Sequence, residues 1–296
     1  MATLLDFRRR IRSIKNTQQI TRAMKFVAAA RLRRAQDRVI AARPYATQIL
    51  RVLRSAMSRE ENVLHPLLAV RPEHKILLVV VSADRGLCGA FNTNVLRRTA
   101  EFLKANQGKA IQLITVGKRV RDALRRSQFP ILAELLNVSV NVQFSHAKEV
   151  AELVIQKYSA EEVDAVYLIY NEFKNVMVQR MMVTRLLPIE REAVGAAPAA
   201  PSEHGAVPAA EVDYIYMQPP GDIFGRLLPR YVESQVFRIL LESAAAEHAA
   251  RMTAMDAATN NAADLIESLT LHMNKVRQAA ITKEIIEVVS GAASAG

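Results

Sequence analysis

The sequence has no tryptophan, a single cysteine and an aromatic content of only 5%. One cysteine, Cys88, cannot form a disulfide within the chain, which fits a reducing compartment. No apolar stretch approaches the roughly 20 residues that a membrane-spanning helix needs, and the N-terminal residues lack the apolar core of a signal peptide. We therefore expect neither a membrane-spanning helix nor a secreted, disulfide-rich fold.

Glycine and proline are missing from two long segments, residues 2–43 and residues 230–290. Both segments are rich in residues that lose little free energy on entering a helix. A helix over 230–290 would be about 90 Å long at ~1.5 Å per residue. Pro229 suits the first turn of such a helix, and Gly291 suits the C-cap. The sequence therefore predicts two unusually long terminal helices.

Both predicted helices carry an apolar stripe at helical spacing. On the first helix a 3-4 repeat passes through Leu4, Phe7, Ile11, Ile14, Gln18, Thr21, Lys25, Ala28, Leu32, Ala35, Val39 and Ala42. Its ends are apolar and its centre is polar, so the repeat predicts a coiled-coil seam with a less apolar centre. On the second helix the stripe passes through Ala262, Leu265, Leu269, Met273, Val276 and Ala280. We expect the helices to pair as an antiparallel coiled-coil shaft; two ordinary helices of a compact bundle are the alternative.

The middle of the chain has the pattern of an α/β domain. Apolar runs predict strands at 75–82, 110–116, 163–170 and 176–187, and alternation predicts an extended segment at 136–144. Helices are expected at 92–106, 118–127 and 146–158. This alternation indicates a Rossmann-like domain with a mainly parallel sheet and an antiparallel edge pair, inserted between the two terminal helices.

The predicted domain organisation has five parts. They are an N-terminal coiled-coil helix at 1–65, a central α/β domain at 73–192, an Ala/Pro-rich flexible insertion at 193–212, a connecting segment at 213–229 and a C-terminal coiled-coil helix at 230–290.

The positive charge is confined to one end of the chain. Residues 1–61 hold 13 arginines and 2 lysines against four acidic residues, an excess equal to the net charge of +11 for the whole chain. Such a basic end favours an acidic counterpart: nucleic acid, anionic lipid or an acidic protein surface. Nucleic acid is disfavoured because no aromatic residues or zinc-ligand spacings accompany the basic residues.

No motif describes an enzyme. The stretch SADRGLCGAFN (Ser82–Asn92) follows the first strand, where α/β folds bind phosphates, but it matches neither common phosphate-binding fingerprint. Gly86 and Gly89 are better explained by a tight turn, Cys88 by burial, and Asp84 with Arg85 by a local ion pair. The six histidines show no metal-binding spacing. We expect no catalytic residue, no cofactor and no metal.

Three stretches, in this order along the chain, resemble one family. They are IKNTQQITRAMKFVAAARLRRAQ (Ile14–Gln36), SADRGLCGAFN, and RYVESQVFRILLESAAAEHAARMTAMDAATNNA with NKVRQAAITKEIIEVVSGAA (Arg230–Ala293). Together they are similar to the signature blocks of the gamma subunit of bacterial F-type ATP synthase. Ala90 stands where the family often has glycine, and the 193–212 stretch looks like an insertion.

The resemblance implies a non-catalytic central rotor shaft that couples ion-driven rotation of the c-ring to ATP synthesis. The shaft would stand inside three alpha and three beta subunits, with epsilon, delta and the c-ring as further partners, and without nucleic acid. It would be peripheral, on the cytoplasmic face of the bacterial plasma (inner) membrane. The implied contacts with beta are Arg277, Gln278, Met24 and Lys25. Those with epsilon and the c-ring are Tyr214, Tyr216 and Met217. Acidic surface on the alpha and beta subunits would face the arginines between Arg31 and Arg38.

Two other classes of function stay open from the residues alone. A basic coiled-coil scaffold or nucleic-acid-binding protein would explain the charge, although the charge lies on one helix and not on a sheet face. A P-loop-like enzyme would explain the α/β domain, although the phosphate fingerprint is missing.

Overall fold

The structure is a computed structural model that describes residues 4–59, 65–189 and 220–294. The chain divides into two compact units: Met1–Ala30 with Arg251–Gly296, and Arg31–Ala250. Two long helices, α1 (Leu4–Arg59) and α6 (Pro220–Ser294), contribute residues to both units. Within the described ranges, no helix contains a stretch long and apolar enough to cross a bilayer.

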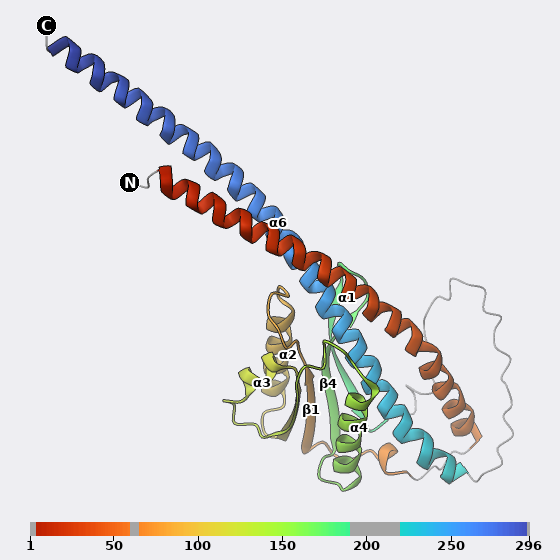
Figure 1. Cartoon of the computed structure of the whole chain (residues 1–296). Helices are drawn as coiled ribbons and strands as arrows, with labels where there is room; N and C mark the ends of the chain where they lie inside the picture. The colour runs from red at the N-terminus through yellow and green to blue at the C-terminus, as the bar shows by residue number, and fades with distance from the viewer. Residues whose placement is uncertain (1–3, 60–64, 190–219, 295–296) are drawn as a thin grey trace. The chain divides into compact units, whose positions relative to one another are not determined.

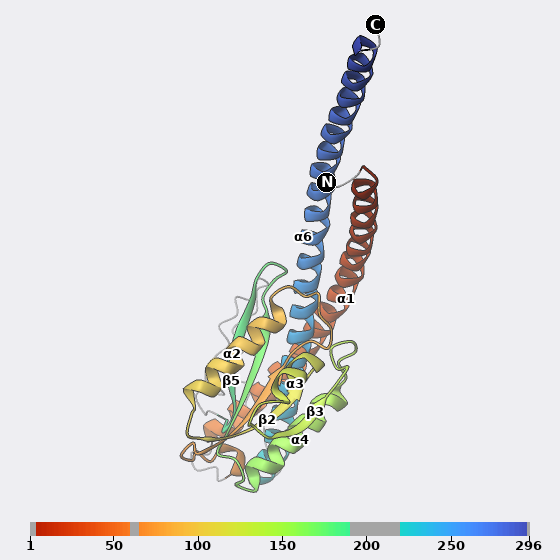
Figure 2. The same ribbon diagram turned by 90° about the vertical axis from the view of Figure 1, so that its left-hand side faces the viewer.

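The first unit is an antiparallel pair of helices. Figures 1 and 2 both show the beginning of α1 beside the later part of α6, running in opposite directions. Contacts across the pair occur in opposite sequence order: Phe7 with His272, Thr21 with Thr259, and Lys25 with Asp256. The predicted antiparallel coiled coil is therefore confirmed.

The seam predicted on α1 is also confirmed in this unit. Its positions are all buried or half-buried: Leu4, Phe7, Ile11, Ile14, Gln18, Thr21, Lys25 and Ala28. On α6 the prediction is wrong at Leu265, which is 54% exposed, while Ile266 is half-buried in its place. The step from Ala262 is four residues and then three, because pairing imposes the coiled-coil period of 3.5 in place of 3.6.

The second unit contains a five-stranded sheet. Its strands are β1 (Lys75–Val81), β2 (Ala110–Val116), β3 (Ile131–Leu135), β4 (Ala165–Phe173) and β5 (Gln179–Leu187). Their order is β3-β2-β1-β4-β5, and only the β4–β5 pair is antiparallel. The predicted mainly parallel sheet with an antiparallel edge pair is confirmed.

Helices cover both faces of this sheet (Figures 1 and 2). They are α2 (Phe91–Ala105), α3 (Lys118–Leu124) and α4 (Phe144–Ser159), with a short helix η1 (Pro66–Leu68) before β1. Side chains of β1 alternate between two apolar cores. Ile76, Leu78 and Val80 pack with α2 and α3, whereas Leu77, Val79 and Val81 pack with α4 and α6. Burial of both faces explains the unbroken apolar run of this strand.

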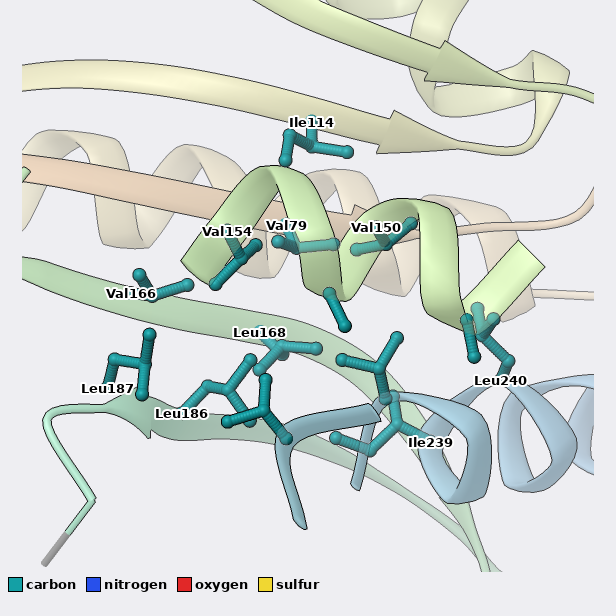
Figure 3. Packing of buried hydrophobic residues seen from close by; sticks show 14 of the residues in the cluster. Val79, Ile114, Val150, Val154, Val166, Leu168, Leu186, Leu187, Ile239 and Leu240 are labelled. Carbon is teal, nitrogen blue, oxygen red and sulfur yellow. The ribbon is translucent and has the colours of Figure 1, made fainter. Parts of the chain in front are cut away.

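The core on the α4 and α6 side ties the sheet to the terminal helices. Figure 3 shows Val79 and Leu168 of the sheet near Val150 of α4 and Ile239 of α6. Leu53 of α1 belongs to the same core and is fully buried. Within the second unit, the α/β domain and both long helices therefore share one apolar core.

The segment 136–144 is not extended, so this part of the sequence prediction is wrong. The edge strand is β3, and residues 136–143 form turns before α4 begins. Val138 and Val142 are buried four residues apart, while Val140 between them is 52% exposed. The alternation of apolar residues therefore comes from a turn in which two valines are buried, and not from a strand.

The long C-terminal helix begins earlier than the sequence predicts. It starts at Pro220 and passes through Pro229, and Gly291 lies inside the helix and is not its C-cap. Pro229 cannot donate a backbone hydrogen bond, which costs the helix stability. Phe224, Leu228 and Val232 lie at four-residue spacing and are each fully buried, and their packing offsets this cost.

Candidate functional site

The last turns of α6 present an open surface. Arg277 and Gln278 are both exposed, as the sequence predicts for contact residues. Beyond them lie exposed apolar side chains: Ile281, Ile285, Ile286, Val288 and Val289, between 48% and 72% exposed. Apolar side chains gathered in this way mark a surface for binding another protein.

The predicted contact pair on α1 has two different environments. Met24 is half-buried, whereas the Lys25 ammonium lies 2.6 Å from the Asp256 carboxylate of α6. Lys25 thus has a partner within its own chain. The neighbouring Phe26 and Val27 are 62% and 53% exposed.

These two exposed residues are candidate contacts that the sequence reasoning missed. Ile20 joins them at 60% exposure on the same helix. All three are apolar and fall between the seam positions. Apolar residues outside the seam could have been used to predict an exposed apolar face on this helix.

In the arginine cluster between Arg31 and Arg38, only Arg31 is half-buried. Arg33, Arg34 and Arg38 are exposed. Arg38, however, donates hydrogen bonds to the Asn141 side chain at 2.8 Å and to the Val142 carbonyl at 3.4 Å. Arg38 thus links α1 to the turn before α4 while it stays exposed, and the expected contact of the cluster with acidic surface stays a prediction.

Tyr214, Tyr216 and Met217, expected to contact epsilon and the c-ring, lie outside the described residues. The same holds for the insertion at 193–212.

The turn after β1 is closed by an acidic side chain. Asp84 accepts hydrogen bonds from the backbone N–H groups of Lys118 and Asn137, at 3.1 and 3.0 Å, and from the Ser139 hydroxyl at 3.2 Å. The expected local ion pair with Arg85 is therefore wrong. The carboxylate sits at the N-terminal end of α3, where a bound phosphate would otherwise be held. This arrangement disfavours nucleotide binding at the turn.

Two glycines have positive φ angles in this region, one in the turn after β1 and one just after β2. Gly89 has a φ of +57°, and Gly117 has a φ of +100°. A Cβ atom on Gly117 would lie 2.3 Å from the Ser82 carbonyl oxygen, so no larger residue fits there. Cys88 is 1% exposed and lies 3.1 Å from the Asn92 amide nitrogen. Its burial agrees with the predicted structural role.

A connected group of ionic contacts lies at the end of the sheet that is opposite to the turn after β1. Glu73 contacts Lys109 at 3.1 Å, Arg185 at 3.3 Å and the Tyr167 hydroxyl at 2.8 Å. Burial alone would raise the pKa of Glu73, but the hydrogen bonds from Tyr167 and Lys109 and the two positive charges together lower it. This group joins the segment before β1 and the residue before β2 to strands β4 and β5, and has a structural role.

Across the described ranges, no cluster of three or more histidine, cysteine or acidic side chains is arranged to hold a metal ion. The described residues instead form surfaces: a long helix pair, an α/β domain, and exposed apolar and basic faces. These features define a structural or coupling subunit of a larger assembly.

Comparison with known proteins identifies the assembly. The family model described as ATP synthase matches residues 3–295. An ATP synthase gamma chain of Solibacter usitatus is 50% identical over 299 residues, covering 100% of both chains. That of Pelotomaculum thermopropionicum is 48% identical, covering 99% of each chain. The chain belongs to the ATP synthase gamma chain family.

Solved structures agree with this assignment. The chain is similar to one from the central stalk and c-ring of the Tetrahymena thermophila mitochondrial ATP synthase, with a TM-score of 0.59, 28% identity, and coverage of 81% of this chain and 99% of that one. A chain of the Euglena gracilis mitochondrial enzyme shares the fold, with a TM-score of 0.64, 20% identity, and coverage of 98% and 94%. The family and the likeness to the Tetrahymena chain give the chain a non-catalytic central-stalk role.

Proposed function

We propose that the helix pair is the rotating shaft inside a ring of three alpha and three beta subunits. The α/β domain is the foot that rests on epsilon and the membrane c-ring. The observation that carries this proposal is the exposed apolar and basic surface at the end of α6, where Arg277 and Gln278 precede five exposed aliphatic side chains. A ring of partner subunits would cover that surface.

The shaft acts through differences in contact energy. A single asymmetric shaft in a three-fold ring touches each beta subunit differently, so each catalytic site is biased towards a different conformation. Shifting such a site from 1:99 to 99:1 needs about 5.5 kcal/mol of differential interaction. Turning the shaft moves these biases from one beta subunit to the next, and ion flow through the c-ring supplies the work.

Particular contacts follow from this proposal. Arg277 and Gln278 hydrogen-bond a loop of beta, and Met24 and Lys25 lie at a second contact with the C-terminal region of beta. Exposed Arg33 and Arg34 face acidic surface on the ring. Tyr214, Tyr216 and Met217 contact epsilon and the c-ring. Attachment through the c-ring places the chain peripherally at the cytoplasmic face of the bacterial plasma membrane.

The test is reconstitution with matching alpha and beta subunits, followed by measurement of ATP hydrolysis. We expect no hydrolysis by the chain alone, and a higher turnover of the alpha–beta mixture when the chain is added. A chain that neither binds alpha and beta nor changes their turnover would refute the shaft role. Binding of its basic helix to nucleic acid, tested across a salt series, would then be the next measurement.

A further inference from the structure

The polar centre of the helix pair holds a connected set of contacts, here named the polar layer. Its members are Gln18, Thr21 and Lys25 on α1, and Asp256 and Thr259 on α6. Lys25 Nζ lies 2.6 Å from Asp256 Oδ1, and the Thr21 and Thr259 hydroxyl oxygens lie 2.8 Å apart. The Gln18 amide nitrogen is 3.5 Å from the Thr259 carbonyl oxygen. We infer that the polar layer sets the axial register of the shaft, and that Lys25 is a positioning residue acting through Asp256.

Directly beside the polar layer, the apolar seam selects a register only weakly. Ala28 and Ala262, on either side of the polar layer, are small and buried at 2% and 6% exposure. Small side chains of this kind pack nearly as well after one helix slides by a turn. A polar residue in a coiled-coil seam, by contrast, specifies the register when it is satisfied only opposite its own partner.

The ion pair discriminates between registers better than the threonines do. The Thr21 hydroxyl can donate to the Gln18 carbonyl at 3.0 Å, and the Thr259 hydroxyl to the Met255 carbonyl at 2.7 Å. Each hydroxyl therefore has an acceptor on its own helix in any register. Lys25 and Asp256 lose their partner when the helices slide. The side chains are 36% and 46% exposed, so water compensates part of that loss.

A fixed register has a consequence for the proposed shaft, and this step rests on the proposed function. Contacts with the ring come from both helices, with Met24 on α1 and Arg277 on α6. A slip of one turn moves one helix by about 5.4 Å along the other. The two contacts would then no longer fit one beta subunit together. The polar layer thus keeps the two helices presenting one composite surface to the ring.

The test is a charge swap in the complex reconstituted with alpha and beta subunits. The variants are Lys25→Asp, Asp256→Lys and the two combined. Register is read by disulfide formation between Phe7→Cys and His272→Cys, which replace rings 5.1 Å apart. A second reporter, Phe7→Cys with Val276→Cys, detects a slip of one turn. Thr21→Val with Thr259→Val is the matched control, which we expect to keep the native register.

We expect each single change to place like charges together and to raise the slipped-to-native cross-link ratio, by up to about fivefold for a half-exposed pair. We also expect each single change to lower ATP hydrolysis by the complex. The combined charge swap should restore both the native cross-link and the hydrolysis rate. A swap that restores neither, although both single changes impair hydrolysis, would show that Lys25 acts on a partner subunit. Unchanged cross-links in the single variants would show that the register is set elsewhere. Failure of the unmodified chain to stimulate hydrolysis would count against the shaft role, while the cross-links would still report the register. The milder Lys25→Met variant covers the case in which a single swap fails to fold.

Discussion

Replacing Asp84 by alanine should destabilise the α/β domain by about 2–3 kcal/mol. Its carboxylate accepts two part-buried backbone N–H groups, from Lys118 and Asn137, and the Ser139 hydroxyl. A donor left without an acceptor costs ~1–3 kcal/mol. We take the lower end for each of the three, because Asp84 is 9% exposed and water can reach part of the site. The turns after β1, β2 and β3 would lose the side chain that joins them.

Asp84→Asn is the matched control. The amide oxygen can accept both N–H groups, which share one carboxylate oxygen in the structure, and the amide nitrogen can donate to Ser139. We expect this variant to lose less than about 1 kcal/mol. Urea unfolding followed by circular dichroism measures both changes, and hydrogen exchange at the Lys118 and Asn137 amides locates them. The reasoning is refuted if alanine is no worse than asparagine, or if neither amide exchanges faster in the alanine variant.

Three further predictions concern other parts of the chain. Arg277→Ala with Gln278→Ala should lower ATP hydrolysis by the reconstituted complex. The unfolding free energy of the chain should change by less than about 0.5 kcal/mol, because both residues are exposed. Unimpaired hydrolysis would contradict the proposed contact. Glu73→Gln should destabilise the chain at neutral pH, and because the folded-state pKa of Glu73 is lowered, the difference from the unmodified chain should shrink as the pH falls below its ordinary value of 4.5. A difference in urea midpoint that does not depend on pH would count against this assignment. Leu53→Ala, at a fully buried position of the shared core, should cost about 2–5 kcal/mol in urea unfolding, and a loss under 1 kcal/mol would mean that α1 does not anchor there.

Periodicity in the sequence was enough to predict the helix pair and the sheet. The α1 seam could be predicted because a repeat of three and four residues has only one side that can be buried. The buried strands could be predicted because β1, covered on both faces, must be apolar throughout. In both cases the spacing of apolar residues along the chain is set directly by which side chains are buried.

The features that the sequence did not reveal depend on partners distant in the chain. Leu265 and Ile266 are both apolar, and only the position of α1 decides which of them is buried. Asp84 could bond to its neighbour Arg85, but its actual partners, at 118, 137 and 139, are brought near by the sheet. The sequence predicts a helix start at Pro229, but this residue lies inside α6, because the burial of the residues around it keeps the helix continuous.

Rotation of the chain inside the ring is the most direct test of its role as a shaft. A bead attached to the α/β domain of the chain, in a complex whose alpha and beta subunits are fixed to a surface, would report the motion during ATP hydrolysis. We expect rotation in one direction with three stops per turn, one for each beta subunit. Hydrolysis stimulated by the chain while the bead does not turn would contradict this role.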